Sequence, residues 1–404
     1  MKRILVGLFV GVLLGSLLFV GADHFSSKQE LVTPPMAPSV AVSKVSGTNY
    51  TAFLFTGKGG IAIDPNLLSN ELKRAAESEH GSFHILAVPV DKNGTVVVGY
   101  GVKFFKDGRI AVKVLRTPAS SLSKLSRDII MKNLDEWVKE KVTFHPDIKA
   151  EIKVGMPKGY GGKLLNKNTG KELSMSAEGT SEPYWHDFGP IEDQVIDPPY
   201  GNIYMTYHVW GLWNDGNPER EWLAVAGDGT TSLANSYYRI EPGIALRNYF
   251  GNTDYKDFKT KEAVISHKWN LDPALKPELG AVNPTTMSGE QTLTLGVGAE
   301  GASISYTVVI PDSEIVSYTN GVSPQADWVL KFNTGAACAK SSFSTMVGSV
   351  ASFDENTLHD GNWHKIVEVD FKVTFQRNYW KYYIIPSTES HDTSMGIVWL
   401  LRVG

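Results

Sequence analysis

Residues 367–376 have the sequence Val-Glu-Val-Asp-Phe-Lys-Val-Thr-Phe-Gln, in which apolar and polar side chains alternate without a break. Successive side chains of a β-strand point to opposite faces of its sheet, so this stretch predicts a long strand with one buried face. Arg377-Asn378 then predicts a turn into a strand over residues 379–385, and residues 395–403 predict a closing strand. This end of the chain is therefore predicted to be an antiparallel sheet.

The same alternation recurs upstream, in residues 203–210 and in residues 293–310 around Glu300-Gly301. Strands that each have one apolar face, spread from residue 184 to residue 404, are typical of two antiparallel sheets packed face to face. Residues 179–404 are thus predicted to form a large all-β antiparallel sandwich of jelly-roll-like class.

Residues 46–178 predict a smaller α+β domain. Asp64-Pro65 is typical of a helix start, and that helix would end near Glu79. Residues 120–140 carry apolar side chains at helical spacing, so a second helix should lie across a sheet. Strands separated by Asn-Gly and Asp-Gly dipeptides, which favour tight hairpin turns, predict that sheet as an antiparallel meander of residues 84–90, 95–105 and 109–117.

The amino-terminal segment predicts export. Ile4 to Ala22 are nineteen residues without a charge, preceded by Lys2 and Arg3. The small residues before Asp23 fit cleavage of a signal peptide after Ala22, whereas an uncleaved segment of this length would anchor the chain in a membrane. Both alternatives place the rest of the chain outside the cytoplasm, secreted or held at the cell surface. Residues 23–45 contain three prolines and predict an extended tether.

Charge is divided unevenly along the chain. The formal net charge is −4, but residues 46–178 hold 20 Lys and Arg against 14 Asp and Glu, and residues 179–404 hold 15 against 27. Opposite charges would let the two halves dock, or let the basic half face anionic lipid headgroups. Glycines at positions 7, 11 and 15 would permit self-association of anchored helices. No basic run interleaved with aromatics is present, which disfavours nucleic-acid binding.

Short catalytic motifs are absent from the sequence. It contains no Gly-x-Ser-x-Gly, no His-Glu-x-x-His and no Asp-Thr/Ser-Gly, so no catalytic residue is assigned. Glycosidases remain open, because two carboxylates from distant loops suffice for them. Cys338 is the only cysteine, which excludes an intrachain disulfide and a cysteine-based metal cluster.

Two groups of residues are candidate binding sites. The densest acidic group would either bind calcium or form a solvated loop. It comprises Asp187, Glu192, Asp193 and Asp197. A set of tryptophans with polar neighbours would form a platform for sugar rings, or would belong to the core; it comprises Trp185, Trp210, Trp213, Asn214, Asp215 and Trp222. Asn49 and Asn93 each begin an Asn-x-Thr triplet and are candidate glycosylation sites in an exported chain.

Two segments carry resemblances. Residues 200–217, Tyr-Gly-Asn-Ile-Tyr-Met-Thr-Tyr-His-Val-Trp-Gly-Leu-Trp-Asn-Asp-Gly-Asn, resemble segments of uncharacterised exported all-β proteins of archaea, which implies export and the fold class only. Residues 358–366, Leu-His-Asp-Gly-Asn-Trp-His-Lys-Ile, are similar to a segment of laminin-G-like and other lectin-like jelly rolls. That second resemblance implies a sandwich whose loops bind glycans or calcium.

These observations favour an exported, non-catalytic binding or structural module of the cell envelope or the extracellular space. The alternative is a secreted carbohydrate-binding or glycoside-hydrolysing protein. A third hypothesis, a pore-former, rests on residues 291–310, whose two arms approach ten residues each and alternate apolar residues with Gly, Ser or Thr. A membrane-inserting β-hairpin has this pattern, although so does a half-buried sandwich strand.

Overall fold

The computed structural model describes residues 39–58, 62–79, 83–92, 94–149, 183–215, 217, 219–226, 237–249, 252–283, 286–297, 302–320, 324–381 and 385–403. The predicted export segment, residues 1–22, lies outside these ranges. The described chain is mostly β, with few helices and two sheets rich in antiparallel pairs. That much of the predicted fold class is confirmed.

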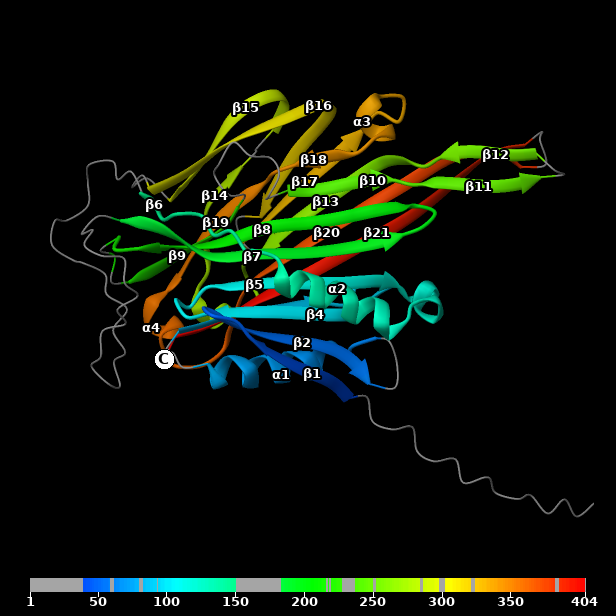
Figure 1. Cartoon of the computed structure of the whole chain (residues 1–404). Coiled ribbons are helices and arrows are strands. Elements are labelled where there is room, and N and C mark those ends of the chain that lie inside the picture. The colour runs from blue at the N-terminus through cyan, green and yellow to red at the C-terminus, as the bar shows by residue number, and fades with distance from the viewer. Residues whose placement is uncertain are drawn as a thin grey trace, which may run out of the picture. The chain divides into compact units, whose positions relative to one another are not determined.

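The first sheet has twelve strands in the described residues (Figure 1). Nine of them follow one another across it: β1 (Ser39–Ser46), β2 (Tyr50–Lys58), β4 (Thr95–Phe105), β5 (Ile110–Pro118), β7 (Tyr184–Asp197), β8 (Gly201–Trp213), β9 (Arg220–Ala226), β19 (Gly348–Asp354) and β14 (Glu278–Asn283). Three shorter strands branch from this path: β6 (Ile148–Lys149) pairs with β7, and β10 (Tyr237–Pro242) pairs with β8 and with β18 (Phe343–Thr345).

The second sheet has seven strands. Their order is β15 (Thr286–Val297), β16 (Ala302–Asn320), β17 (Gln325–Phe332), β13 (Lys259–Lys268), β20 (His364–Lys381), β21 (Ile385–Val403) and β3 (Phe83–Val90). A separate hairpin consists of β11 (Ile244–Tyr249) and β12 (Asn252–Asp257). The helical segments are α1 (Pro65–Ser78), η1 (Ala119–Lys124), α2 (Arg127–Lys139), η2 (Pro273–Leu275), α3 (Ala337–Lys340) and α4 (Glu355–Leu358). Among the described residues, no helix combines the length and the hydrophobicity required to cross a membrane.

The alternation in residues 367–376 predicts β20 correctly. Its apolar side chains are at most 1% exposed: Val367, Val369, Phe371, Val373 and Phe375. The turn predicted at Arg377-Asn378 is wrong, because β20 continues to Lys381 and pairs there with Ile385 at the start of β21. Arg377 is 5% exposed, and its guanidinium lies on the Phe258 ring and is bonded to Glu389 of β21. These contacts hold the strand straight where its sequence resembles a turn.

The predicted amino-terminal elements are present. Asp64 caps α1 by accepting a hydrogen bond from the Asn66 N–H at 2.8 Å, and the meander strands are β3, β4 and β5. β4 and β5 pair directly, but β3 joins the other sheet, beside β21. The helix predicted over residues 120–140 is divided into η1 and α2, and α2 lies against β4 as expected.

The two predicted domains, residues 46–178 and 179–404, share both sheets. β5 pairs in parallel with β7, and β3 pairs antiparallel with β21. Residues 38–404 consequently form one compact unit instead of two. The tether predicted through residue 45 also ends earlier, because Ser39–Ser46 form β1 and pair with β2 along their whole length. The sequence of residues 39–46 alone does not distinguish an extended tether from a strand, because the strand forms only by pairing with β2, which comes later in the chain.

A buried arginine of the first sheet links the two sheets. The Arg116 guanidinium of β5 contacts both Asp193 carboxylate oxygens at 2.8 and 2.9 Å, and both side chains are fully buried. The same guanidinium donates hydrogen bonds of 2.7 Å to the carbonyls of Val90 and Gly396, which belong to β3 and β21. One side chain of the first sheet thus satisfies backbone groups of the second.

Candidate functional site

The predicted tryptophan platform is not formed. Trp185 and Trp210 are 0% exposed and belong to the core, so neither can contact a sugar in this structure. Trp213 is half-buried against the rings of Phe83 and Phe188, which stack on each other. Trp222 is half-buried against Gly280 on β14. The alternative reading of these tryptophans as core residues applies to the first two.

The polar residues of that platform lie in a turn. Asn214 follows β8 with φ at +60°, the left-handed conformation that asparagine tolerates, and Asp215 comes next in the chain. The Asp215 carboxylate accepts a hydrogen bond from the Asn217 N–H at 3.2 Å. A side-chain carboxylate that accepts a hydrogen bond from the backbone N–H two residues later is typical of an Asx turn.

The four acidic residues proposed for calcium lie along β7, and each has a different partner. The Asp187 carboxylate is bonded to His208, Glu192 to Lys113 at 2.7 Å, and Asp193 to Arg116. Asp197 accepts hydrogen bonds from His391 at 2.7 Å and from the Thr393 hydroxyl at 2.8 Å. Carboxylates with separate partners along one strand do not converge on one cation, so the structure does not bring this predicted site together.

The predicted glycosylation sites remain predictions. Asn49 is exposed in the turn between β1 and β2, and its carbonyl accepts a hydrogen bond from the Lys106 N–H. Asn93 lies outside the described residues.

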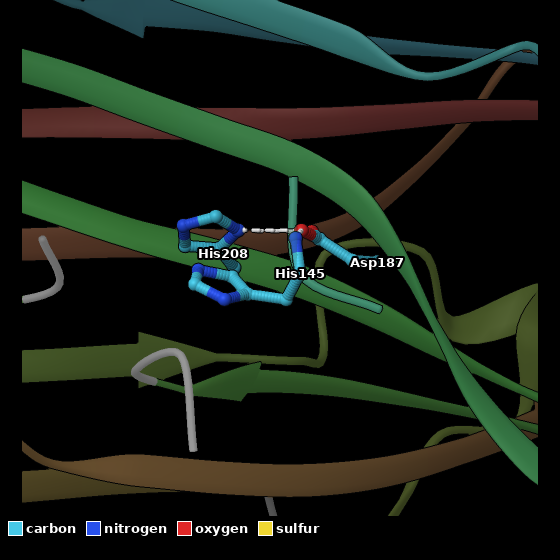
Figure 2. Close-up of side chains that lie close together, drawn as sticks. All are labelled: His145, Asp187 and His208. Carbon is cyan, nitrogen blue, oxygen red and sulfur yellow. Dashed lines mark hydrogen bonds and ion pairs between the residues drawn. The ribbon is translucent and has the colours of Figure 1, made fainter. Parts of the chain in front are cut away.

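A buried cluster of two histidines and an aspartate lies on β7, β8 and the segment after α2 (Figure 2). Asp187 is 0%, His208 1% and His145 8% exposed. The His208 Nδ1 atom lies 2.9 and 3.0 Å from the two Asp187 oxygens. The His145 and His208 rings meet edge to face, with their centroids 4.5 Å apart.

Backbone donors fix the Asp187 carboxylate. It accepts hydrogen bonds from the His145 N–H at 3.0 Å and from the Gly189 N–H at 2.8 Å. Gly189 sits at a bulge of β7 with φ at +128°, where a Cβ would lie 1.7 Å from the Ile110 carbonyl oxygen. Only glycine fits there, and the bulge brings its N–H to Asp187. Burial acts to raise the pKa of Asp187, but the two histidines and the backbone donors together lower that pKa below its usual value.

The sequence offers no short spacing that would reveal this cluster. His145 and His208 are far apart in the chain, and the sequence predicts a role for Asp187 only as part of the acidic group proposed for calcium. The register of β7 with β8 brings Asp187 opposite Trp210, two residues from His208. A signal of this kind depends on strand pairing, which local patterns do not supply.

His208 also lines a cavity of about 360 Å³ between the first sheet and the end of α2. Its wall is polar and carries both signs of charge, with Lys113 and Glu192 bonded to each other and Arg239 lying on the Tyr204 ring at 4.0 Å. The cavity leads to the buried cluster at His208 and can admit water or a small ion.

The third element of interest is the β15–β16 hairpin at the edge of the second sheet (Figure 1). Nine residue pairs connect its outer part, from Gly289 with Ile310 to Val297 with Ala302. One alternate set pairs apolar residues: Leu293 with Tyr306, Leu295 with Ile304 and Val297 with Ala302. Over the same span the other set pairs small or hydroxyl residues: Thr292 with Thr307, Thr294 with Ser305 and Gly296 with Ser303. The three remaining pairs do not follow this pattern: Gly289 with Ile310, Glu290 with Val309 and Gln291 with Val308.

A break in the ladder separates this outer part from the base of the hairpin. After the pair of Gly289 with Ile310, the next pair is Met287 with Ile315, so residues 311–314 oppose Ser288 alone. Pro311 opens that stretch and has no N–H to donate. Beyond the break, β16 pairs with β17 from Ser313 to Asn320.

Neither a protein-family model nor a curated protein matches this chain. Solved structures do match. One, described as a pore-forming protein, has a TM-score of 0.31 and 11% identity, with 61% of this chain and 95% of that chain covered. Another is the Clostridium perfringens NetB toxin in its membrane-inserted form, with a TM-score of 0.29, 10% identity, and 54% of this chain and 97% of that chain covered. Likenesses this distant show neither a shared family nor a shared activity.

The matches nevertheless correct two predictions. One match is described as a pore-forming protein and the other as a toxin in its membrane-inserted form, and neither is an archaeal exported protein or a lectin-like jelly roll, so the two resemblances given by the sequence are not borne out. In the structure, Asp360-Gly361 does form the turn before β20, but a turn of this kind precedes strands in many folds. The hypothesis of an envelope or extracellular binding or structural module is not borne out either: the descriptions of the matches correspond to the pore-forming hypothesis, and at this distance they assign no role to this chain.

Proposed function

We propose that this chain is an exported β-pore-forming protein whose inserting element is the outer β15–β16 hairpin, residues 289–310. The observation that carries the proposal is the strand register from Thr292 with Thr307 to Val297 with Ala302, in which apolar residues oppose apolar residues and small or hydroxyl residues oppose one another. Residues directly opposite in an antiparallel pair share a face of the sheet. Over these pairs the hairpin therefore has one apolar face and one polar face.

This two-faced pattern matches what a transmembrane barrel requires. Barrel strands alternate side chains between the lipid and the lumen, and about 9–11 residues cross the membrane at the usual tilt. The outer hairpin has nine pairs, which meets the lower end of that range, and six of them carry the two-faced pattern, from Thr292 with Thr307 to Val297 with Ala302. In this arrangement Leu293, Leu295 and Val297 would face lipid, and Thr292, Thr294 and Gly296 would face the lumen.

The position of the hairpin allows it to move as a unit. β15 is the last strand of its sheet among the described residues, and residues 302–310 of β16 pair with β15 alone. Release of the outer hairpin therefore breaks no backbone ladder with β17. Residues 311 and 312, which pair with neither β15 nor β17 in the described ladders, provide the point at which it would swing away.

Assembly of several copies follows from the same physics. A single hairpin leaves two open edges in lipid, where each unpaired backbone group costs several kcal/mol. Closure into a barrel satisfies those groups, so each chain would contribute one hairpin to a ring of copies. Pore formation of this kind needs no catalytic residue.

Two substitutions at neighbouring positions test the proposal. Leu295→Arg places a charge on the expected lipid face, which costs about 2–4 kcal/mol per chain at the bilayer midplane. Thr294→Arg places the same charge on the expected lumen face. Each variant is mixed with liposomes that contain a self-quenched dye, and dye release is measured against chain concentration.

We expect wild type and Thr294→Arg to release dye, and Leu295→Arg to lose release. The lumen charge should also shift the ion selectivity of single channels toward anions. Circular dichroism and urea denaturation serve as controls that both variants fold as wild type does. Equal release by the two variants would contradict the assignment of faces, and no release by wild type across lipid compositions would contradict pore formation.

A further inference from the structure

We propose that His145, Asp187 and His208 form a binding site for one divalent transition-metal ion, of which Zn²⁺ fits best. One ligand atom from each residue lies within 4.8 Å of the others, and all three residues are buried. Two imidazoles and one carboxylate form a ligand set that zinc accepts, with its fourth position open to water.

The distances require little rearrangement. Zinc bonds to nitrogen and oxygen are about 2.0–2.1 Å long, so two ligand atoms on a tetrahedral zinc lie about 3.3 Å apart. The His208 Nδ1 atom lies 2.9 and 3.0 Å from the Asp187 oxygens. A metal that replaces the hydrogen of this contact therefore needs the pair to open by only a few tenths of an ångström.

His145 is held where its ring can join them. Its own N–H is bonded to Asp187, which fixes the backbone of residue 145 over β7 and β8. Its ring lies edge to face on the His208 ring at 4.5 Å, as Figure 2 shows. A change of side-chain torsion, without backbone movement, would turn a ring nitrogen toward an ion between the three residues.

The surroundings supply the other requirements of a metal site. The Gly189 N–H holds one Asp187 oxygen, and hydrogen bonds of this kind orient metal-binding carboxylates. His208 lines the cavity of about 360 Å³, which gives an ion a path and leaves room for a water ligand. The Trp210 ring stacks on His145 at 5.9 Å and its buried indole N–H has no hydrogen-bond partner among the described residues.

The donor set also predicts selectivity. Calcium and magnesium prefer six or more oxygen ligands, whereas this cluster offers one carboxylate and two imidazoles. Zn²⁺ and Co²⁺ should therefore bind, and Ca²⁺ and Mg²⁺ should not compete. The bound ion would fasten the segment after α2 to the first sheet. The site is independent of the β15–β16 hairpin, so failure of pore formation would leave this inference standing.

The test uses untagged full-length protein, because a histidine tag would bind the same metals. The protein is stripped with a chelator, and Zn²⁺ is titrated by calorimetry with metal content measured after dialysis. Co²⁺ is then added and its visible absorption recorded, since a four-coordinate site gives intense bands without any variant. We expect one ion per chain and no displacement by millimolar Ca²⁺.

Three variants and one matched control complete the test. His208→Gln, His145→Gln and Asp187→Asn should each weaken Zn²⁺ binding by at least about tenfold. His186→Gln is the control, because His186 is a neighbour on β7 that is bonded to Asp147 instead of the cluster. Absence of a 1:1 Zn²⁺ complex in wild type would overturn the proposal. Equal binding by the control and all three variants would also overturn it, whether or not one variant fails to fold.

Discussion

Replacement of Arg116 by methionine tests whether the two sheets are linked by one buried guanidinium, which is paired with Asp193 in the first sheet and bonded to two carbonyls of the second. The substitution removes a guanidinium that is fully buried, and it leaves the Asp193 carboxylate without its cation. It also removes the donors to the Val90 and Gly396 carbonyls on the second sheet. Removal of one partner of a buried pair typically costs about 3–5 kcal/mol, so we expect a loss of that order in the free energy of unfolding.

The assay is urea denaturation followed by tryptophan fluorescence, with Arg74→Met as the matched control. Arg74 pairs with Glu71 at 2.7 Å on the surface of α1, where its side chain is 74% exposed. The control should change stability by less than about 0.5 kcal/mol. A loss below about 1 kcal/mol in Arg116→Met would refute the account of how the sheets are joined.

The same variant should acquire a pH dependence. Burial raises the pKa of Asp193, and Arg116 opposes that rise in the wild type. Without the guanidinium, the folded state holds a proton on Asp193 at a pH where the unfolded chain has lost it. A group whose pKa is raised by folding stabilises at low pH, so the stability of Arg116→Met should increase as the pH falls from 7 to 5. An unchanged deficit across this range would show that Asp193 is not left buried and charged.

Two further predictions concern the core. His267 is fully buried between the Tyr238 hydroxyl and the Ser349 hydroxyl, and burial lowers its pKa to about 3. As the pH falls, His267 is protonated in the unfolded chain before it is protonated in the folded protein. We therefore expect the free energy of unfolding to fall by about 2–3 kcal/mol between pH 6.5 and 4.5. The free energy of unfolding of His267→Gln should fall less over that interval, and an identical pH profile for both proteins would contradict the assignment. Gly99→Val should destabilise the protein by about 1–3 kcal/mol, because a Cβ there would lie 2.7 Å from the Ile130 side chain of α2. Thermal unfolding checks the second prediction, and a melting temperature equal to that of wild type would mean that α2 does not pack on β4 as described.

Local patterns predicted the elements whose structure depends on neighbouring residues. Alternation located β20, the Asp-Gly dipeptide located the turn between β4 and β5, and Asp64-Pro65 located the start of α1. Each of these features is decided within a few residues of sequence. The turn at Arg377 was mispredicted because a contact with Glu389, in another strand, overrides the local preference.

Local patterns do not predict which distant segments of the chain pair with each other. The parallel pairing of β5 with β7 joins the two predicted domains in one sheet. Nothing in the composition of either segment predicts that these two strands pair. The burial of Trp185 and Trp210 depends on which face of β7 and β8 meets the core. The His145, Asp187 and His208 cluster likewise exists only once β7 and β8 are in register. The pattern of the sequence predicts the hairpin of residues 291–310, whereas its break at residues 311–314 is visible only in the register of the strands.

The environment of each residue along β15 in the presence of lipid tests the central proposal most directly. In a Cys338→Ser background, single cysteines are placed in turn at residues 292–297 and labelled with an environment-sensitive fluorophore. On addition of liposomes, the account predicts increased, blue-shifted emission at residues 293, 295 and 297, and a water-like signal at 292, 294 and 296. A uniform signal along the strand, or no change with lipid at any position, would contradict insertion of this hairpin.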